Sequence, residues 1–199
     1  MANLIRGLKI LGCATAVGVL IAAGSSPARA DAMADCNQRE NRDLRIRGCT
    51  ALIQSGKLSP ENVALAHNLR GAAYQDKGDL ERAFTDYDEA LRRDPTLEAA
   101  LAGKILVREE AMIACEQTTD RARQLTGCSA TIRFFGKDAP IPRATAYLAR
   151  GLLYRDRGMR QEAIADLKKA IETEPAPTSP RGRELVNRAQ GALDALTKK

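Results

Sequence analysis

The chain has 199 residues, a formal net charge of +6, no tryptophan and an aromatic content of 4%. Basic and acidic residues are well mixed along it, so the clustered basic face that nucleic-acid binding requires is not expected, and neither is a nucleic-acid partner. The scarcity of aromatic rings weighs against binding by stacking on sugar faces.

The first thirty residues have the features of an export signal. Arg6 and Lys9 precede an apolar stretch from Ile10 to Ala23, and Ala28-Arg29-Ala30 is a small-x-small cleavage pattern. We therefore expect cleavage after Ala30 and a periplasmic or secreted protein without a stable membrane span, with an uncleaved anchor as the alternative. Cleavage removes three basic residues and no acid, which lowers the formal net charge from +6 to +3.

The cysteines beyond the signal form two pairs with one spacing. Cys36 and Cys49 are thirteen residues apart, as are Cys115 and Cys128, and their flanking residues repeat, which indicates an internal duplication. In an oxidising compartment an even cysteine count predicts disulfides. Three connectivities are open, and the duplication favours Cys36–Cys49 and Cys115–Cys128. A zinc site is the alternative, but the spacing is wide and His67 is the sole histidine.

This pairing requires the chain to reverse inside each cysteine block. Residues thirteen apart in one helix lie about 20 Å from each other, whereas a disulfide needs Cα atoms about 5.5–6 Å apart. We therefore expect helical hairpins at 31–58 and 98–138, with helix starts at Asn41 and at 118–120. The expected packing positions of their second helices are Ile46, Thr50 and Ile53, and Leu125, Ser129 and Ile132.

Two further segments, 64–97 and 144–177, repeat each other with an offset of 80 residues. Small residues are expected where two helices cross, larger side chains between them, and glycine or proline at helix ends. The residues at these places are Gly71, Tyr74, Gly78, Ala83, Tyr87, Ala90 and Pro95, and then Gly151, Tyr154, Gly158, Ala163, Leu167, Ala170 and Pro175. Their spacing resembles the tetratricopeptide repeat. The chain departs from that repeat just before Gly71 and Gly151, where the family often has a leucine and this sequence has Arg70 and Arg150.

The resemblance implies an all-α fold, an α-solenoid of antiparallel helical hairpins in a single domain over 31–199. Ser59-Pro60 and Ser179-Pro180 are typical helix starts. A capping helix at 179–197, with an apolar stripe, is expected to cover the last repeat. The segment 96–116 either bridges the two halves or begins the second half.

No catalytic constellation is recognisable in the sequence. A structural role is expected for His67, and the glycines do not form a phosphate-binding loop. Acid pairs such as Asp86 with Asp88 are expected to be solvated, so we predict no enzyme, no metal and no cofactor. An envelope enzyme that uses Glu109, Glu110 and Glu116 is kept as a remote alternative.

Proteins with tetratricopeptide repeats commonly bind peptides or proteins on a concave surface, and the resemblance implies the same here. We expect an adaptor that binds another envelope protein or an extended peptide, of unspecified oligomeric state. Binding of cell-wall glycan, or assistance to a wall-processing enzyme, is the alternative. Leu148 and Leu152 are equally compatible with the core. The candidate groove residues are Leu65, Asn68, Ala72, Gln75, Thr145, Leu148, Leu152 and Arg155.

The disulfide assignment predicts that the exported protein has no free thiol. Alkylation of denatured, unreduced protein should label no cysteine, and reduction should expose all four. Labelling of four cysteines without reduction would contradict the assignment.

Overall fold

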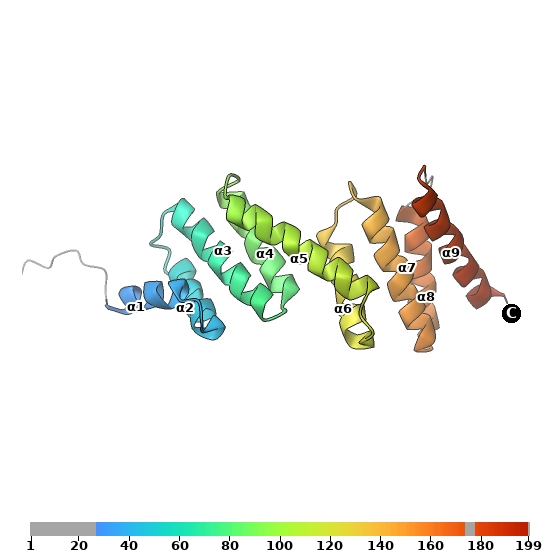
Figure 1. Ribbon diagram of the computed structural model, residues 1–199, viewed down its shortest axis with the longest axis horizontal. Coiled ribbons are helices and arrows are strands. Elements are labelled where there is room, and N and C mark those ends of the chain that lie inside the picture. The colour runs from blue at the N-terminus through green and yellow to red at the C-terminus, as the bar shows by residue number, and fades with distance from the viewer. Residues whose placement is uncertain (1–26, 174–177, 199) are drawn as a thin grey trace, which may run out of the picture.

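The structure is a computed structural model that describes residues 27–173 and 178–198, which fold into nine α-helices without a strand. The helices follow one another as antiparallel pairs along one axis (Figure 1), which confirms the predicted all-α solenoid. Residues 1–26 of the expected signal and Pro175 lie outside the described residues. The helices are α1 (Pro27–Asn37), α2 (Arg42–Gln54), α3 (Pro60–Asp76), α4 (Leu80–Arg93), α5 (Glu98–Glu116), α6 (Arg121–Phe134), α7 (Pro140–Asp156), α8 (Arg160–Thr173) and α9 (Pro180–Thr197).

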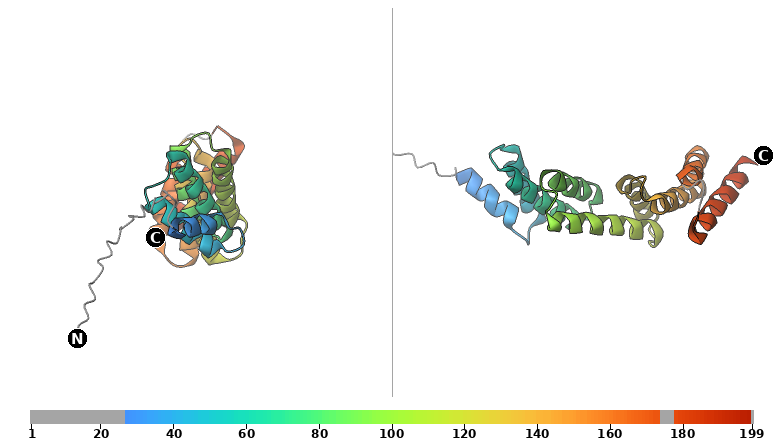
Figure 2. Two further views of the ribbon diagram at one scale, coloured as in Figure 1. Left: turned by 90° about the vertical axis from the view of Figure 1, so that its left-hand side faces the viewer. Right: turned by 90° about the horizontal axis from the view of Figure 1, so that it is seen from above.

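The helices form two layers. The odd-numbered helices α1, α3, α5, α7 and α9 contact one another in turn, and we call them the odd-helix layer. Each even-numbered helix packs against the odd-numbered helices before and after it, and Figure 2 shows this row from its end and from above. In the described ranges, no helix combines the length and apolarity needed to cross a membrane.

Polar side chains begin the helices where the sequence predicts chain reversal. Asn41 Oδ1 accepts hydrogen bonds from the backbone N–H groups of the first turn of α2, and Asp120 Oδ1 does the same for α6. At the other end of the hairpin helices, Gly78 and Gly158 have φ values of 76° and 74°, a left-handed conformation that ends α3 and α7. The hairpin turns are therefore encoded locally.

In each cysteine hairpin a disulfide joins the two helices, and a glycine lets them approach closely. Cys36 bonds Cys49 and Cys115 bonds Cys128, with Cα–Cα distances of 4.6 and 4.5 Å, so the zinc alternative does not apply to these residues. A Cβ atom on Gly48, the residue before Cys49, would lie 2.5 Å from the backbone nitrogen of Cys36. The same position before Cys128 is also glycine. The two helices of each hairpin can approach this closely because that residue has no side chain.

The predicted packing positions of α2 and α6 are half-buried, with Ile53 and Ile132 packed against buried clusters, and more deeply buried residues lie next to them. Arg45, Cys49 and Leu52 are buried in α2, whereas the expected Ile46, Thr50 and Ile53 are half-buried. In α6 the buried residues include Cys128 and Thr131, and the expected Leu125, Ser129 and Ile132 are again half-buried. The reason is that each disulfide holds its cysteine directly toward the partner helix, which sets the rotation of the whole helix.

Helix α5 begins the second half and also joins the two halves. It forms a hairpin with α6 through Cys115–Cys128, and Val107 and Ala111 share a buried cluster with Tyr87 of α4. Nearby, Phe84 and Phe134 stack with ring centroids 4.2 Å apart. The last hairpin is covered by α9, whose Leu185 and Ala189 pack in one cluster with Leu167 of α8. The structure thus contains the predicted capping helix.

The closest of these packing contacts gives a test of the α4–α5 junction. A Cβ on Gly103 would lie 2.3 Å from Tyr87 Cζ, so Gly103→Ala should lower the free energy of unfolding by about 1–3 kcal/mol despite the better helix propensity of alanine. Gly191 in α9 has no atom within 4 Å of the same position, and Gly191→Ala should raise it by about 0.5–1 kcal/mol. Equal effects in chemical denaturation would contradict the close α4–α5 packing.

Candidate functional site

A pocket of about 520 Å³ opens between α5, α7 and α9. Its floor is apolar and includes Leu148, Leu152 and Leu153 of α7 together with Leu185 of α9. Its rim carries charged side chains of both signs from α5, α6, α7 and α9: Glu116, Arg121, Arg155, Asp156, Arg181, Glu184 and Arg188. An apolar floor beneath a polar rim is typical of sites that bind a ligand by burying part of it.

The structure brings the four groove candidates of the second repeat together in this pocket, because Thr145, Leu148, Leu152 and Arg155 all line it. Leu148 is 4% exposed and belongs to the core as well as to the floor, whereas Leu152 is half-buried and Arg155 is exposed. Their role in binding stays a prediction.

The four groove candidates of the first repeat do not line this pocket. Leu65 is 45% exposed on α3, and Asn68 and Ala72 are half-buried. Gln75 has another role, since it donates a hydrogen bond to Glu110 of α5 at 2.6 Å and accepts one from the Tyr87 hydroxyl at 2.9 Å. Burial raises the pKa of Tyr87 to about 12, so its hydroxyl stays protonated and donates.

The rim of the pocket holds one arginine that is free to bind a ligand. Asp156 pairs with Arg155 at 2.9 Å and with Arg121 at 4.0 Å, and Glu116 pairs with Arg181 at 3.7 Å. In the described part of the chain, Arg188 makes no hydrogen bond or ion pair. Its guanidinium is therefore the rim cation that can donate hydrogen bonds to a ligand carboxylate without breaking an existing contact.

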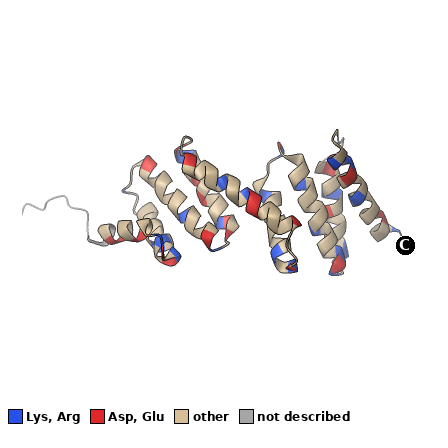
Figure 3. Cartoon of the chain, in the orientation of Figure 1, with Lys and Arg blue, Asp and Glu red and all other residues tan. Residues whose placement is uncertain are grey.

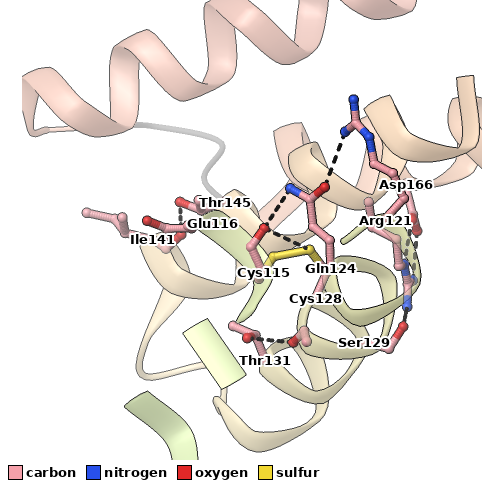
Figure 4. The surroundings of a disulfide bond; sticks show 12 residues. Cys115, Glu116, Arg121, Gln124, Cys128, Ser129, Thr131, Ile141, Thr145 and Asp166 are labelled. Carbon is pink, nitrogen blue, oxygen red and sulfur yellow. Dashed lines mark hydrogen bonds and ion pairs between the residues drawn. A yellow bond between two sulfur atoms is a disulfide. The ribbon is translucent and has the colours of Figure 1, made fainter. Parts of the chain in front are cut away.

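Figure 4 shows the second disulfide with the hydrogen bonds around it, beside the wall of the pocket. Gln124 donates a hydrogen bond to the carbonyl oxygen of Cys115 at 2.9 Å, and Arg121 donates one to Gln124 Oε1 at 3.2 Å. Both Cys115 and Gln124 line the pocket. The covalent bond and the hydrogen bonds together fix the end of α5 against the start of α6.

A buried charged bridge joins the first cysteine hairpin to the first clean repeat. Arg70 of α3 donates two hydrogen bonds to Asp86 of α4, each at 2.8 Å, and a third to the Thr50 hydroxyl of α2 at 2.9 Å. Asp86 is 4% exposed. Burial alone would raise its pKa, but the hydrogen bonds from Arg70 and His67 outweigh burial and hold the pKa of Asp86 below its usual value.

The same bridge recurs in the second half. Arg150 donates to both carboxylate oxygens of Asp166, at 2.7 and 2.9 Å, and to the Ser129 hydroxyl at 3.0 Å. The hydrogen bond to Asp166 raises the pKa of Arg150, and burial of the guanidinium opposes this shift. Each bridge therefore joins three helices from two successive hairpins.

Sequence reasoning missed these bridges. The expectation that Asp86 is solvated like Asp88 is wrong, since Asp86 is buried against Arg70. The signal was present: an arginine replaces the usual leucine in both repeats, and Arg, Asp and a hydroxyl residue recur in both halves of the duplication. The partner of each arginine is sixteen residues away on the next helix, so no local pattern identifies it.

His67 has a structural environment, as expected. It is 6% exposed, and its Nδ1 lies 2.8 Å from Asp86 Oδ1. The acids of the remote enzyme hypothesis do not converge: Glu116 lines the pocket described above, whereas Glu110 lines a second pocket of about 560 Å³ beside the α3–α4 turn. Elsewhere, charges of both signs are interspersed along the chain (Figure 3).

Comparison with known proteins agrees with the hairpin geometry. Residues 64–97 and residues 144–177 each match the tetratricopeptide repeat. No curated protein matches the chain.

The depressed pKa of Asp86 gives a pH-dependent prediction. Its ordinary unfolded pKa is about 3.9, so the stabilisation is fully present above about pH 4–5 and is lost as pH falls through the lower folded pKa. Asp86→Asn should lower the free energy of unfolding at pH 7 by about 3–5 kcal/mol and flatten its acid dependence. Asp88→Asn, which affects a half-exposed pair with Lys104, should cost less than about 1 kcal/mol. Urea denaturation between pH 2 and 7 measures both, and parallel curves for wild type and Asp86→Asn would contradict the prediction.

Proposed function

The chain is a tetratricopeptide-repeat protein, and we propose that it is an exported adaptor that binds a segment of another envelope protein on its odd-helix layer. Tetratricopeptide repeats are in general non-enzymatic scaffolds for protein–protein interaction. The observation that carries the proposal is the pocket between α5, α7 and α9, with its leucine floor and charged rim.

The pocket suits an apolar side chain of a partner followed by a carboxylate. Its volume of about 520 Å³ is within the range of ligand pockets, about 300–1,000 Å³. An apolar anchor would cover Leu152, and a neighbouring acid would reach the unpaired guanidinium of Arg188. Because the pocket wall is already fixed by the Cys115–Cys128 disulfide, little conformational freedom would be lost on binding.

The same pocket favours a protein partner over a glycan or a substrate. None of its lining residues is aromatic, whereas sugar binding usually depends on stacking against aromatic rings. Two of its three acids, Glu116 and Asp156, are paired with arginines, which leaves Glu184 as the single carboxylate of the lining without an ion pair in the described structure. A pair of carboxylates with opposed environments is therefore not formed.

Export to an oxidising compartment fits the disulfides, which persist mainly outside the cytosol. The expected cleavage after Ala30 falls inside α1 (Pro27–Asn37). The mature protein would keep Cys36. It would also keep Ala32 and Asp35, whose atoms lie close to the Cβ position of Gly48 where α1 and α2 cross. The first hairpin therefore retains its crossing after cleavage.

Site-specific photocrosslinking tests the proposed surface. A photoreactive amino acid at Leu152, in the full chain expressed in intact cells, should give one discrete protein adduct. The matched control is Ala165, which is exposed on α8 in the other layer and should give none. Arg188→Glu should reduce the Leu152 adduct, because it removes the unpaired cation. The same adducts from both positions, or none from Leu152, would contradict the proposal.

A further inference from the structure

Helix α5 carries an exposed apolar surface that nothing in the described chain covers. Leu101 is 51% exposed, Ile105 46%, Leu106 50% and Ile113 53%, and we call these four residues the α5 strip. The strip holds four of the seven exposed large hydrophobic residues of the described structure. A concentration of this kind on one helix is typical of an interaction surface.

The strip lies opposite the packed side of its helix. At about 100° per residue, its residues fall within an arc of about 140°, and the buried Gly103 and Val107 fall on the other side. Helix α5 contacts α3 on one flank and α7 on the other. The strip is thus part of the outer surface of the odd-helix layer, to which the pocket also opens.

The two cations of α5 contact side chains outside the helix, whereas two of its acids do not. Lys104 turns back to form an ion pair with Asp88 of α4, and Arg108 lies 4.1 Å over the ring of Phe135. By contrast, Glu98 and Glu109 are exposed, and neither has a hydrogen-bond or ion-pair partner within residues 27–173 and 178–198. The outer side of α5 therefore combines apolar residues with unpaired carboxylates.

We propose that the α5 strip docks a basic amphipathic helix of the partner. This rests on the proposed function and names the chemistry of a second segment of the partner, distinct from the one that enters the pocket. A helix satisfies its own backbone hydrogen bonds, whereas an extended chain would find no strand edge to pair with on a helical surface. Eleven residues separate Glu98 from Glu109, about 16 Å along α5. The partner helix therefore carries Lys or Arg about three turns apart, beside an apolar stripe.

Two other occupants fit the charges less well. A second copy of this chain would set the unpaired Glu98 and Glu109 against identical carboxylates, and like charges repel. The apolar segment from Ile10 to Ala23 of the same chain contains no Lys or Arg, and the preceding Arg6 and Lys9 are too close together to reach both carboxylates.

Binding of designed peptides to the full, disulfide-bonded chain tests the proposal. The probe is a fluorescent 18-residue helix with a leucine stripe flanked by lysines, measured by anisotropy. There are two reference peptides. In the first, every lysine is replaced by glutamate; in the second, the composition is the same but the leucines do not form a stripe. The lysine peptide should bind at least about tenfold more tightly than either reference.

Charge reversal in the chain identifies the surface. The double variant Glu98→Lys with Glu109→Lys should bind the lysine peptide about three- to tenfold more weakly and the glutamate peptide more tightly than the unchanged chain does. Glu162→Lys, an exposed acid on α8, is the matched control and should change neither. The double variant Leu101→Ser with Ile105→Ser should bind the lysine peptide at least about tenfold more weakly. The control is Met159→Ser, which changes another exposed residue and should leave the affinity unchanged. Glu98 and Glu162 both lie in the first turn of their helices, so both charge reversals should lower the free energy of unfolding by about the same 0.3–1 kcal/mol. A difference in peptide binding between the two variants therefore does not come from stability.

Equal binding of the lysine and glutamate peptides, or no effect of the Leu101 and Ile105 substitutions, would overturn the proposal. So would concentration-dependent dimerisation that these substitutions abolish, because a second copy would then be the occupant. The proposed function is tested separately: a crosslink from Leu152 with none from Ile105 would keep the adaptor function and reject this strip.

Discussion

The bridge from a half-buried arginine to a buried aspartate and a hydroxyl is the interaction on which the rest of the structure depends. It occurs at Arg70 with Asp86 and Thr50, and again at Arg150 with Asp166 and Ser129. A buried carboxylate is costly unless it keeps its cation, so the three helices that supply each bridge hold one relative position. Where a leucine would give only non-directional packing, the arginine adds fixed geometry between successive hairpins.

The remaining constraints act within hairpins and support the same surface. Disulfides close the α1–α2 and α5–α6 hairpins, and a glycine before the second cysteine of each permits the close crossing. The Phe84–Phe134 stack and the contact of Tyr87 with α5 then join the halves. Because each hairpin is fixed to the next, the odd-helix layer presents the pocket and the α5 strip as one continuous surface.

The features that could be predicted from the sequence are those with local or repeated signals. Helix starts at Asn41 and Ser59, helix ends at glycine and the disulfide pairing follow from short patterns and the duplication. The rotation of α2 and α6 could not be predicted, because the disulfide geometry overrides the apolar pattern. The bridges and the contribution of α9 to the pocket depend on contacts between different helices. Pattern reasoning found the α7 side of the pocket, but not Arg188 on the opposite wall.

The central claim is that each bridge couples two hairpins through one arginine, and a double-mutant cycle measures this directly. Ser129→Ala and Asp166→Asn, singly and together, are compared in the free energy of unfolding. The account predicts a coupling energy of about 0.5–3 kcal/mol, because both residues act through Arg150. Additive effects, within about 0.3–0.5 kcal/mol, would show that Ser129 and Asp166 act independently and would contradict the account.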